Sequence, residues 1–292
     1  MIPGSRPGLA VALMLAAALL SGVDAVIVRL LAGEVHPLLI GFFRAGFGLL
    51  AVLPWIVTRV DLRASPYRWL HAVRAGLKLA ALVSLFVAFA HAPLADATAI
   101  SFTMPIFLTL GAWLVLGERV GAGRGLGVLA GFGGILVIIR PGASSFDPWL
   151  LFALASAVLT AAIQLILRRM AQRDTTDRLV AWNLLTMVPL GLLAALPVWT
   201  TPTPQQFALL ALQGGLGALN MTLITRAFAL ADASFLAPLD FLRLPVIAAL
   251  AFAFFGEIPP LSTWIGAAVI FATALMVAGG QRLRRRPPDI GP

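Results

Sequence analysis

The chain contains the same passage twice, about 140 residues apart. The sequence LADAT at residues 94–98 is followed by Gly-Glu at 117–118, and LADAS at residues 230–234 is followed by Gly-Glu at 256–257. An internal repeat constrains a fold more than any single motif, because both copies must adopt equivalent structures and pack together. We therefore expect two related halves with a shared interface.

The composition places both halves in a membrane. Apolar residues make up 60% of the 292 residues, charged residues make up 11%, and the mean hydropathy is +0.98. A soluble protein carries about a quarter charged residues, so this chain cannot cover a surface in water and lipid must surround it. The absence of cysteine excludes disulfides and thiolate chemistry. The three histidines are scattered and predict no metal site, so we expect no cofactor.

Ten segments are long and apolar enough to cross roughly 30 Å of hydrocarbon, which takes about 20 residues. They are residues 9–31, 37–58, 69–90, 95–116, 122–139, 149–169, 179–199, 206–228, 233–255 and 262–280. The first run lacks a clean small-residue cleavage site, so we expect an uncleaved span rather than a signal peptide. The expected divisions are an N-terminal tail (1–8), two repeats of five spans (9–142 and 143–280) and a basic tail (281–292).

The placement of arginine predicts the orientation. The net charge is +9, and arginines concentrate in both tails and in alternate loops, whereas the opposite set of loops contains Arg140. The positive-inside rule then places both termini in the cytoplasm, and charge of this kind does not indicate nucleic-acid binding. Because five spans is an odd number, the second repeat crosses the membrane in the opposite sense. Exchanging the conformations of the two halves would open a central site to the other side.

Each repeat resembles a known superfamily. An Ala-Asp-Ala turn, a proline within the following span (Pro105 and Pro245), Gly-Glu at the end of that span and a glycine-rich next span are similar to the drug/metabolite transporter (DMT) superfamily. Within it the chain resembles the EamA-type ten-helix exporters, over residues 9–280 in two copies. The resemblance implies an all-α integral membrane fold of ten helices in an inverted 5+5 repeat, in a bacterial inner membrane. The oligomeric state is left open between a monomer and a homodimer.

The same resemblance implies export of small metabolites by alternating access, most often of amino acids, as in the bacterial aromatic amino-acid exporters. The superfamily also includes carriers of sugar nucleotides and triose phosphates, so a drug, a nucleoside or a sugar phosphate is an alternative substrate. No Walker motif is present, which leaves facilitated diffusion, favoured here, or exchange against protons. An intramembrane enzyme or a channel is disfavoured, because acidic or histidine clusters and rings of like charge are missing from the sequence.

Five charged residues interrupt the spans: Asp24, Arg44, Lys78, Asp240 and Arg243. Charges inside a membrane are costly and usually functional. In a functional interpretation, Lys78 or Arg243 binds the carboxylate of a zwitterionic substrate, and Asp24 or Asp240 binds its ammonium group. In a structural interpretation, Asp24 pairs with Arg44, Asp240 pairs with Arg243 three residues on, and Lys78 snorkels to the surface. If Lys78 is desolvated, we expect Asp240 to be its partner.

Four uncharged residues complete the candidate site. Gln164 and Asn220 are the best neutral candidates for substrate contact, although polar side chains in spans commonly serve only as hydrogen bonds between helices. Phe86 and Phe102 are candidates for the apolar wall of a pocket, although most aromatic residues in spans face lipid or neighbouring helices.

Prolines and glycines within the spans predict local features. Pro105, Pro238 and Pro245 remove backbone donors and are candidates for hinges or for cavity-lining breaks. Close glycine spacing in the fifth and tenth spans predicts tight helix packing or a dimer surface. Asp96 and Asp232, at the starts of spans, are interpreted as helix caps.

Overall fold

The computed structural model describes residues 7–62, 65–117, 122–143, 146–231 and 233–279, and their regular structure is entirely helical. The helices are α1 (Pro7–Leu31), α2 (Pro37–Arg59), α3 (Arg68–His91), α4 (Leu94–Ser101), α5 (Met104–Leu116), α6 (Ala122–Ile139), α7 (Leu150–Met170), α8 (Thr176–Ala195) with the short 3-10 turn η1 (Leu196–Val198), α9 (Pro204–Leu230), α10 (Ala233–Asp240), α11 (Arg243–Phe255) and α12 (Leu261–Gly279).

The expected all-α fold of ten spans is confirmed. Eight helical segments of the described chain are long and apolar enough to cross a membrane. Two shorter apolar segments, Gly125–Ile139 in α6 and Leu261–Met276 in α12, complete the ten. The fourth expected span consists of α4 and α5, and the ninth consists of α10 and α11, so each repeat contains one broken helix.

Proline accounts for both breaks. Pro105 is the second residue of α5 and Pro245 is the third residue of α11. A proline has no backbone N–H to donate, and its ring clashes with the carbonyl group four residues back. The chain tightens at the first break, where the N–H of Thr103 donates to the carbonyl of Ile100 at 2.9 Å. Pro238 lies inside α10 without ending it, and hinge motion at these three prolines stays a prediction.

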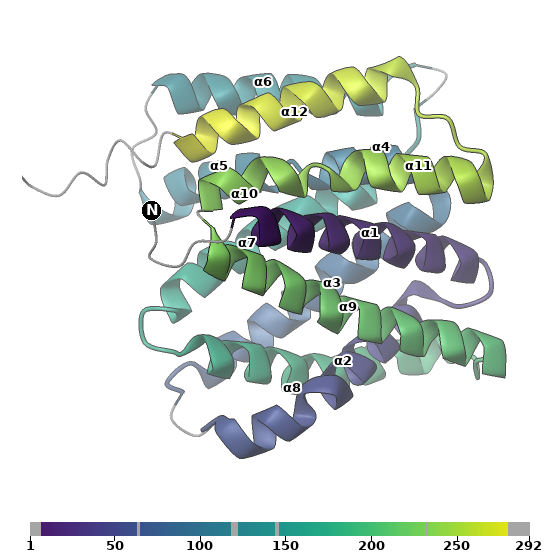
Figure 1. The fold of residues 1–292 in the computed structure, drawn as a ribbon, viewed down its shortest axis with the longest axis vertical. Coiled ribbons are helices and arrows are strands. Elements are labelled where there is room, and N and C mark those ends of the chain that lie inside the picture. The colour runs from purple at the N-terminus through teal and green to yellow at the C-terminus, as the bar shows by residue number, and fades with distance from the viewer. Residues whose placement is uncertain (1–6, 63–64, 118–121, 144–145, 232, 280–292) are drawn as a thin grey trace, which may run out of the picture.

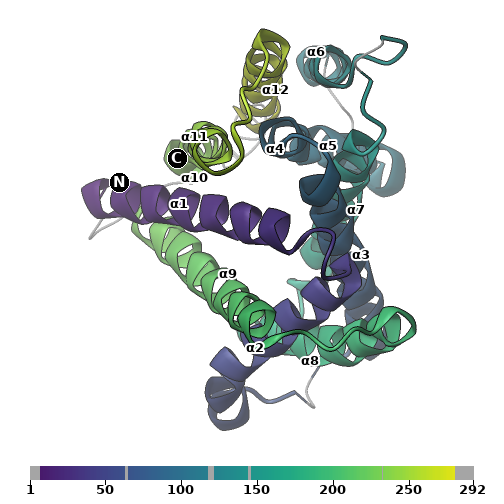
Figure 2. The ribbon, with the colours of Figure 1, turned by 90° about the vertical axis from the view of Figure 1, so that its right-hand side faces the viewer.

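The two repeats pack as equivalents. A shift of 139 residues carries the start of α4, Leu94, to the start of α10, Ala233, and the start of α5, Met104, to the start of α11, Arg243. Helix α1 packs on α9 and α11 as α7 packs on α3 and α5, while α6 meets α12 and α2 meets α8. The α6–α12 pair forms one edge of the molecule and the α2–α8 pair forms the other (Figures 1 and 2). Packing that recurs with the halves exchanged is what an inverted repeat requires.

Helices α6 and α12 approach closely because glycines face each other. A Cβ atom added to Gly266 of α12 would lie 2.8 Å from the carbonyl oxygen of Gly134 in α6. Small residues allow the backbones of membrane helices to come this near. The glycine-rich fifth and tenth spans therefore pack on each other within one chain.

Replacing Gly266 by alanine is expected to lower the free energy of unfolding by about 1–3 kcal/mol, because the new methyl group forces the two helices apart. Gly133 is the matched control, since a Cβ atom there would meet nothing within 4 Å. Alanine at Gly133 should be neutral or stabilising by up to about 1 kcal/mol through its helix propensity. Unfolding by SDS in mixed micelles measures both variants. Equal stabilities would contradict the close approach of the helices.

Candidate functional site

Lys78 is a charged and exposed side chain on a helix that packs against several others. Its helix, α3, packs against α1, α2, α4, α7 and α8, and in Figure 2 it lies beside α7. The side chain of Lys78 is nevertheless exposed, while Leu79 beside it is buried. Lys78 stands ten residues after the start of the helix at Arg68, or about 15 Å along the axis. The charges of Arg44 in α2 and of Arg74 act on its ammonium group, so we infer that Lys78 faces a space between helices rather than lipid.

An ion pair lies beside this space. Arg44 of α2 binds Asp24 of α1, and their side chains are 20% and 15% exposed. The guanidinium group of Arg44 lies against α9, where a Cβ atom at Gly217 would approach it to 3.0 Å. Its other neighbour is the Phe86 ring, with the guanidinium carbon 5.6 Å from the ring centroid. The predicted Asp24–Arg44 pair therefore forms, and glycine at position 217 leaves room for it.

Helix α9 adds amide groups to the same region. Asn220 donates a 3.0 Å hydrogen bond to the hydroxyl of Ser21 in α1, and its buried carbonyl oxygen has no partner among the described residues. Gln213 is fully buried, and neither its amide nitrogen nor its oxygen is bonded within the described chain. Gln213 and Asn220 are seven residues apart, on either side of Gly217, and so share one helix face. Sequence reasoning missed Gln213, although this spacing was a usable signal.

Three sequence-based predictions about this region are not confirmed. They concern Phe86, Gln164 and a contact between Lys78 and Asp240. Phe86 is 1% exposed and packs into the core beneath Arg44, so it does not form a free pocket wall. Gln164 is exposed on α7, and no described hydrogen bond joins it to the residues above. Lys78 does not meet Asp240, because α10 packs against α1, α9 and α12 and not chiefly against α3. The charges that act on Lys78 are those of Arg74 and Arg44, both positive.

A second polar group lies at the two helix breaks. Asp240 and Arg243 form a loose ion pair at 3.9 Å, with side chains 44% and 30% exposed. Arg243 also covers the ring of Phe102, 4.7 Å from its centroid. Phe102 and Phe241 each follow the first half of a broken span, and their rings stack at 4.2 Å. The 139-residue shift makes these two rings equivalent, so the pseudo-two-fold axis passes between them.

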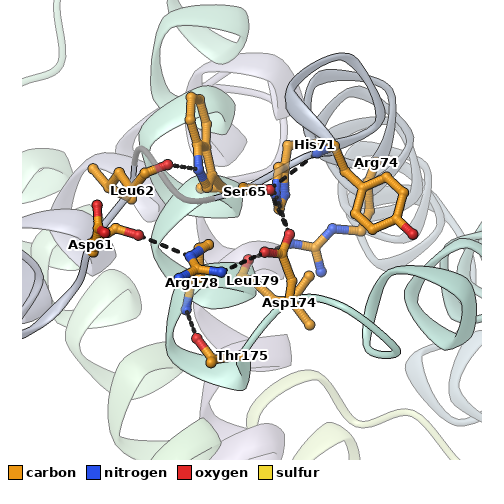
Figure 3. A network of polar contacts seen from close by, with 11 residues as sticks. Asp61, Leu62, Ser65, His71, Arg74, Asp174, Thr175, Arg178 and Leu179 are labelled. Carbon is orange, nitrogen blue, oxygen red and sulfur yellow. Dashed lines mark hydrogen bonds and ion pairs between the residues drawn. The ribbon is translucent and has the colours of Figure 1, made fainter.

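The repeats are joined at one end by buried polar side chains, which we call the Asp174 cluster: Ser65, His71, Asp174 and Arg178 (Figure 3). The hydroxyl of Ser65 donates to Asp174 at 2.6 Å, and Arg178 donates to the other carboxylate oxygen at 2.9 Å. Nε2 of His71 lies 3.1 Å from Asp174 and 2.9 Å from Ser65. Burial alone would raise the pKa of Asp174, but the hydrogen bonds from Ser65 and Arg178 and the nearby His71 hold the pKa below its usual value.

The Asp174 cluster is not arranged as a hydrolase triad. In a triad the serine and the carboxylate bind opposite nitrogens of the imidazole ring. Here Ser65 and Asp174 both contact Nε2 of His71, and Nδ1 is buried without a partner among the described residues. Ser65 and His71 belong to the first repeat and Asp174 to the second, so the cluster links the two repeats. We call such a polar link between the repeats a clasp.

A second clasp joins the repeats at the other end of α3. Glu257 binds Arg29 at 2.7 Å and accepts the backbone N–H of Leu94 at 2.9 Å. Glu257 therefore caps α4, and the interpretation of Asp96 as the cap is wrong. Asp96 lies in the first turn of α4 and accepts a hydrogen bond from Thr263 of α12. Asp232, the other expected cap, lies outside the described residues.

Ten apolar spans in two packed halves, with ionic side chains within the spans, define a multi-pass membrane protein built from a repeat. The model of the EamA-like transporter family matches residues 8–140 and again residues 147–279. The chain therefore belongs to the EamA-like transporter family. The family unit occurs twice in it, as the resemblance to the DMT superfamily implied.

Curated relatives match most of the chain. It is 33% identical to a riboflavin transporter of Rhizobium johnstonii, over 85% of this chain and 82% of the relative. It is 28% identical to an S-adenosylmethionine uptake transporter of Rickettsia bellii, over 88% of this chain and 89% of the relative. A solved crystal structure matches with a TM-score of 0.61 and 20% identity, covering 95% of this chain and 99% of that one, which supports the fold alone.

Proposed function

We propose that the protein is a secondary carrier of a small heteroaromatic metabolite of the riboflavin type, in the cytoplasmic membrane of a bacterium. The observation that carries this proposal is the similarity to proteins named riboflavin transporters, at 33% identity in Rhizobium johnstonii and 32% in Vibrio cholerae. Phe102, a candidate pocket wall, is 6% exposed and is covered by Phe241 and Arg243, so these rings add no free stacking surface to the argument.

Amino-acid export, expected from the superfamily resemblance, is the second candidate. A zwitterion needs a free carboxylate as well as a free cation. Asp24 is occupied by Arg44, and Asp240 is shared with Arg243, whereas Lys78 has no acidic partner among the described residues. The charge arrangement therefore favours a substrate rich in oxygen acceptors over one that carries an ammonium group.

In the proposed transport cycle the two repeats exchange their conformations. The Asp174 cluster and the Arg29–Glu257 pair join the repeats at opposite ends of α3, so we infer that one clasp opens while the other stays closed. The proposal also includes two cytoplasmic tails, two repeats and three hinges. The tails are residues 1–8 and 281–292, the repeats are 9–142 and 143–280, and the hinges are Pro105, Pro238 and Pro245. Facilitated diffusion is the proposed mode, because Asp24 and Asp240, the carboxylates predicted to lie deep in the spans, each have a cation beside them.

Counterflow in proteoliposomes tests the substrate. Vesicles preloaded with unlabelled riboflavin are expected to accumulate labelled riboflavin above the level of protein-free vesicles, without a pH gradient. Preloading with S-adenosylmethionine or tryptophan should give little accumulation of the same compound. Counterflow of tryptophan but not of riboflavin would support amino-acid transport instead, and riboflavin flux only under a pH gradient would overturn facilitated diffusion.

A further inference from the structure

We propose that Lys78 is the centre of a subsite for an oxygen anion, so that the carrier prefers substrates with a phosphate or carboxylate group over their neutral parents. This inference rests on the proposed function and names a chemical feature of its substrate. It begins from the position of Lys78, which is exposed on α3 about 15 Å from the start of the helix and feels the charges of Arg44 and Arg74. A lysine side chain cannot extend from there to the end of the helix, so snorkelling does not explain it.

The second step is the balance of charge inside the spans. Three carboxylates of the described spans have partners other than Lys78: Asp24 binds Arg44, Asp96 accepts from Thr263, and Asp240 pairs with Arg243. None of these is a partner of Lys78. Its charged neighbours are Arg44 and Arg74, and Arg74 is itself held by the carbonyl oxygen of Leu179. The described interior therefore carries a positive charge without a counter-ion.

The third step is the difference between the repeats. The 139-residue shift that relates α4 to α10 carries Lys78 to Gly217 and Arg74 to Gln213. At the equivalent position the second repeat therefore has a glycine, Gly217 of α9. The guanidinium group of Arg44 occupies the space next to this glycine. Because the fold accommodates either residue at this position, packing does not require the ammonium group of Lys78. An unpaired charge is costly inside a membrane, and a bound anion would offset that cost.

The chemistry then defines the ligand. An ammonium group donates up to three hydrogen bonds and binds phosphate or carboxylate as a point charge. Arg74 and Arg44 add positive potential at the ammonium group of Lys78. Flavin mononucleotide combines a flavin ring with a phosphate group, and tryptophan combines an indole ring with a carboxylate. The experiment separates these two sources of the anion.

The test measures inhibition of labelled riboflavin counterflow by unlabelled competitors in proteoliposomes. With the wild-type protein, flavin mononucleotide should inhibit at an about tenfold lower concentration than riboflavin, which corresponds to about 1.4 kcal/mol. Lys78→Met, which keeps the length of the side chain, should abolish that preference, so that flavin mononucleotide and riboflavin inhibit at similar concentrations. Lys78→Arg should retain the preference. Arg173→Met, in an exposed position between α7 and α8, is the matched control for loss of a cation.

The outcomes distinguish this proposal from the proposed function. Riboflavin counterflow with no preference for flavin mononucleotide, or a preference that survives in Lys78→Met, overturns the anion subsite and leaves flavin transport intact. If neither riboflavin nor flavin mononucleotide is transported, the proposed function is wrong. The binding of tryptophan and of tryptophanamide to the purified protein is then compared directly. A preference for the carboxylate that is lost in Lys78→Met would then still support the subsite, and no preference would overturn it.

Discussion

Replacing Asp24 by asparagine is expected to lower the free energy of unfolding by about 3 kcal/mol, because it leaves the guanidinium group of Arg44 without a counter-charge inside the spans. The side chain of Arg44 is 20% exposed and lies between Gly217 and the Phe86 ring. It therefore has no free path to the end of the helix. The measurement is SDS unfolding in mixed micelles, followed by tryptophan fluorescence.

A second variant separates the ion pair from a general loss of packing. Removing both charges, with Asp24→Asn and Arg44→Gln together, should recover most of the lost stability, because neither side chain then carries an unpaired charge. If the double variant is as unstable as Asp24→Asn alone, the cost arises elsewhere. An unchanged stability in Asp24→Asn would mean that the pair does not form in the membrane.

Asp174 is the other position where a single change should have a large effect. Its side chain is completely buried and accepts hydrogen bonds from Ser65 and Arg178 beside His71. Asp174→Asn should cost about 2–4 kcal/mol at pH 7, because the buried donors lose a charged acceptor. Asp177→Asn is the matched control, since Asp177 lies three residues further on and is exposed. It should change the stability by less than about 0.5 kcal/mol.

The contribution of Asp174 depends on pH in a direction that its pKa determines. The folded protein holds this pKa below the value of an unfolded aspartate, which is about 3.9. The stabilisation is therefore fully present above that value and is lost as the pH falls through the folded pKa. The stability difference between the wild type and Asp174→Asn should remain constant from pH 7 to about pH 5 and shrink in stronger acid. A difference that grows in acid would contradict this assignment.

Much of the fold could be read from local properties of the sequence. The lengths of the apolar segments predicted the spans, and the two LADA passages with their Gly-Glu sequences predicted the repeat. The breaks after Ser101 and Asp240 could also be anticipated, because Pro105 and Pro245 affect the backbone turn that directly precedes them. The Asp24–Arg44 pair was accessible as well, since adjacent antiparallel spans bring residues of similar depth together.

The site was less accessible to sequence reasoning. His71 meets Asp174 and Arg29 meets Glu257, and no local pattern links partners this far apart in the chain. The expected contact between Lys78 and Asp240 failed for the same reason, because depth in the membrane says nothing about which helices are neighbours. Phe86 was a candidate for a pocket wall although most aromatic residues in spans pack against lipid or helices, and its packing places it in the core.

The sequence by itself determined that this protein is embedded in a lipid bilayer, has ten membrane spans and contains two repeats of opposite orientation. Hydropathy, span number and duplication are properties of the linear chain. The tertiary structure alone decided which of the predicted charge pairs form, and that Lys78 has no acidic partner within the described part of the chain. The reason is physical: the rotation of each helix about its axis and the choice of its neighbours arise from contacts among all the spans together, and these settle the electrostatics of the interior.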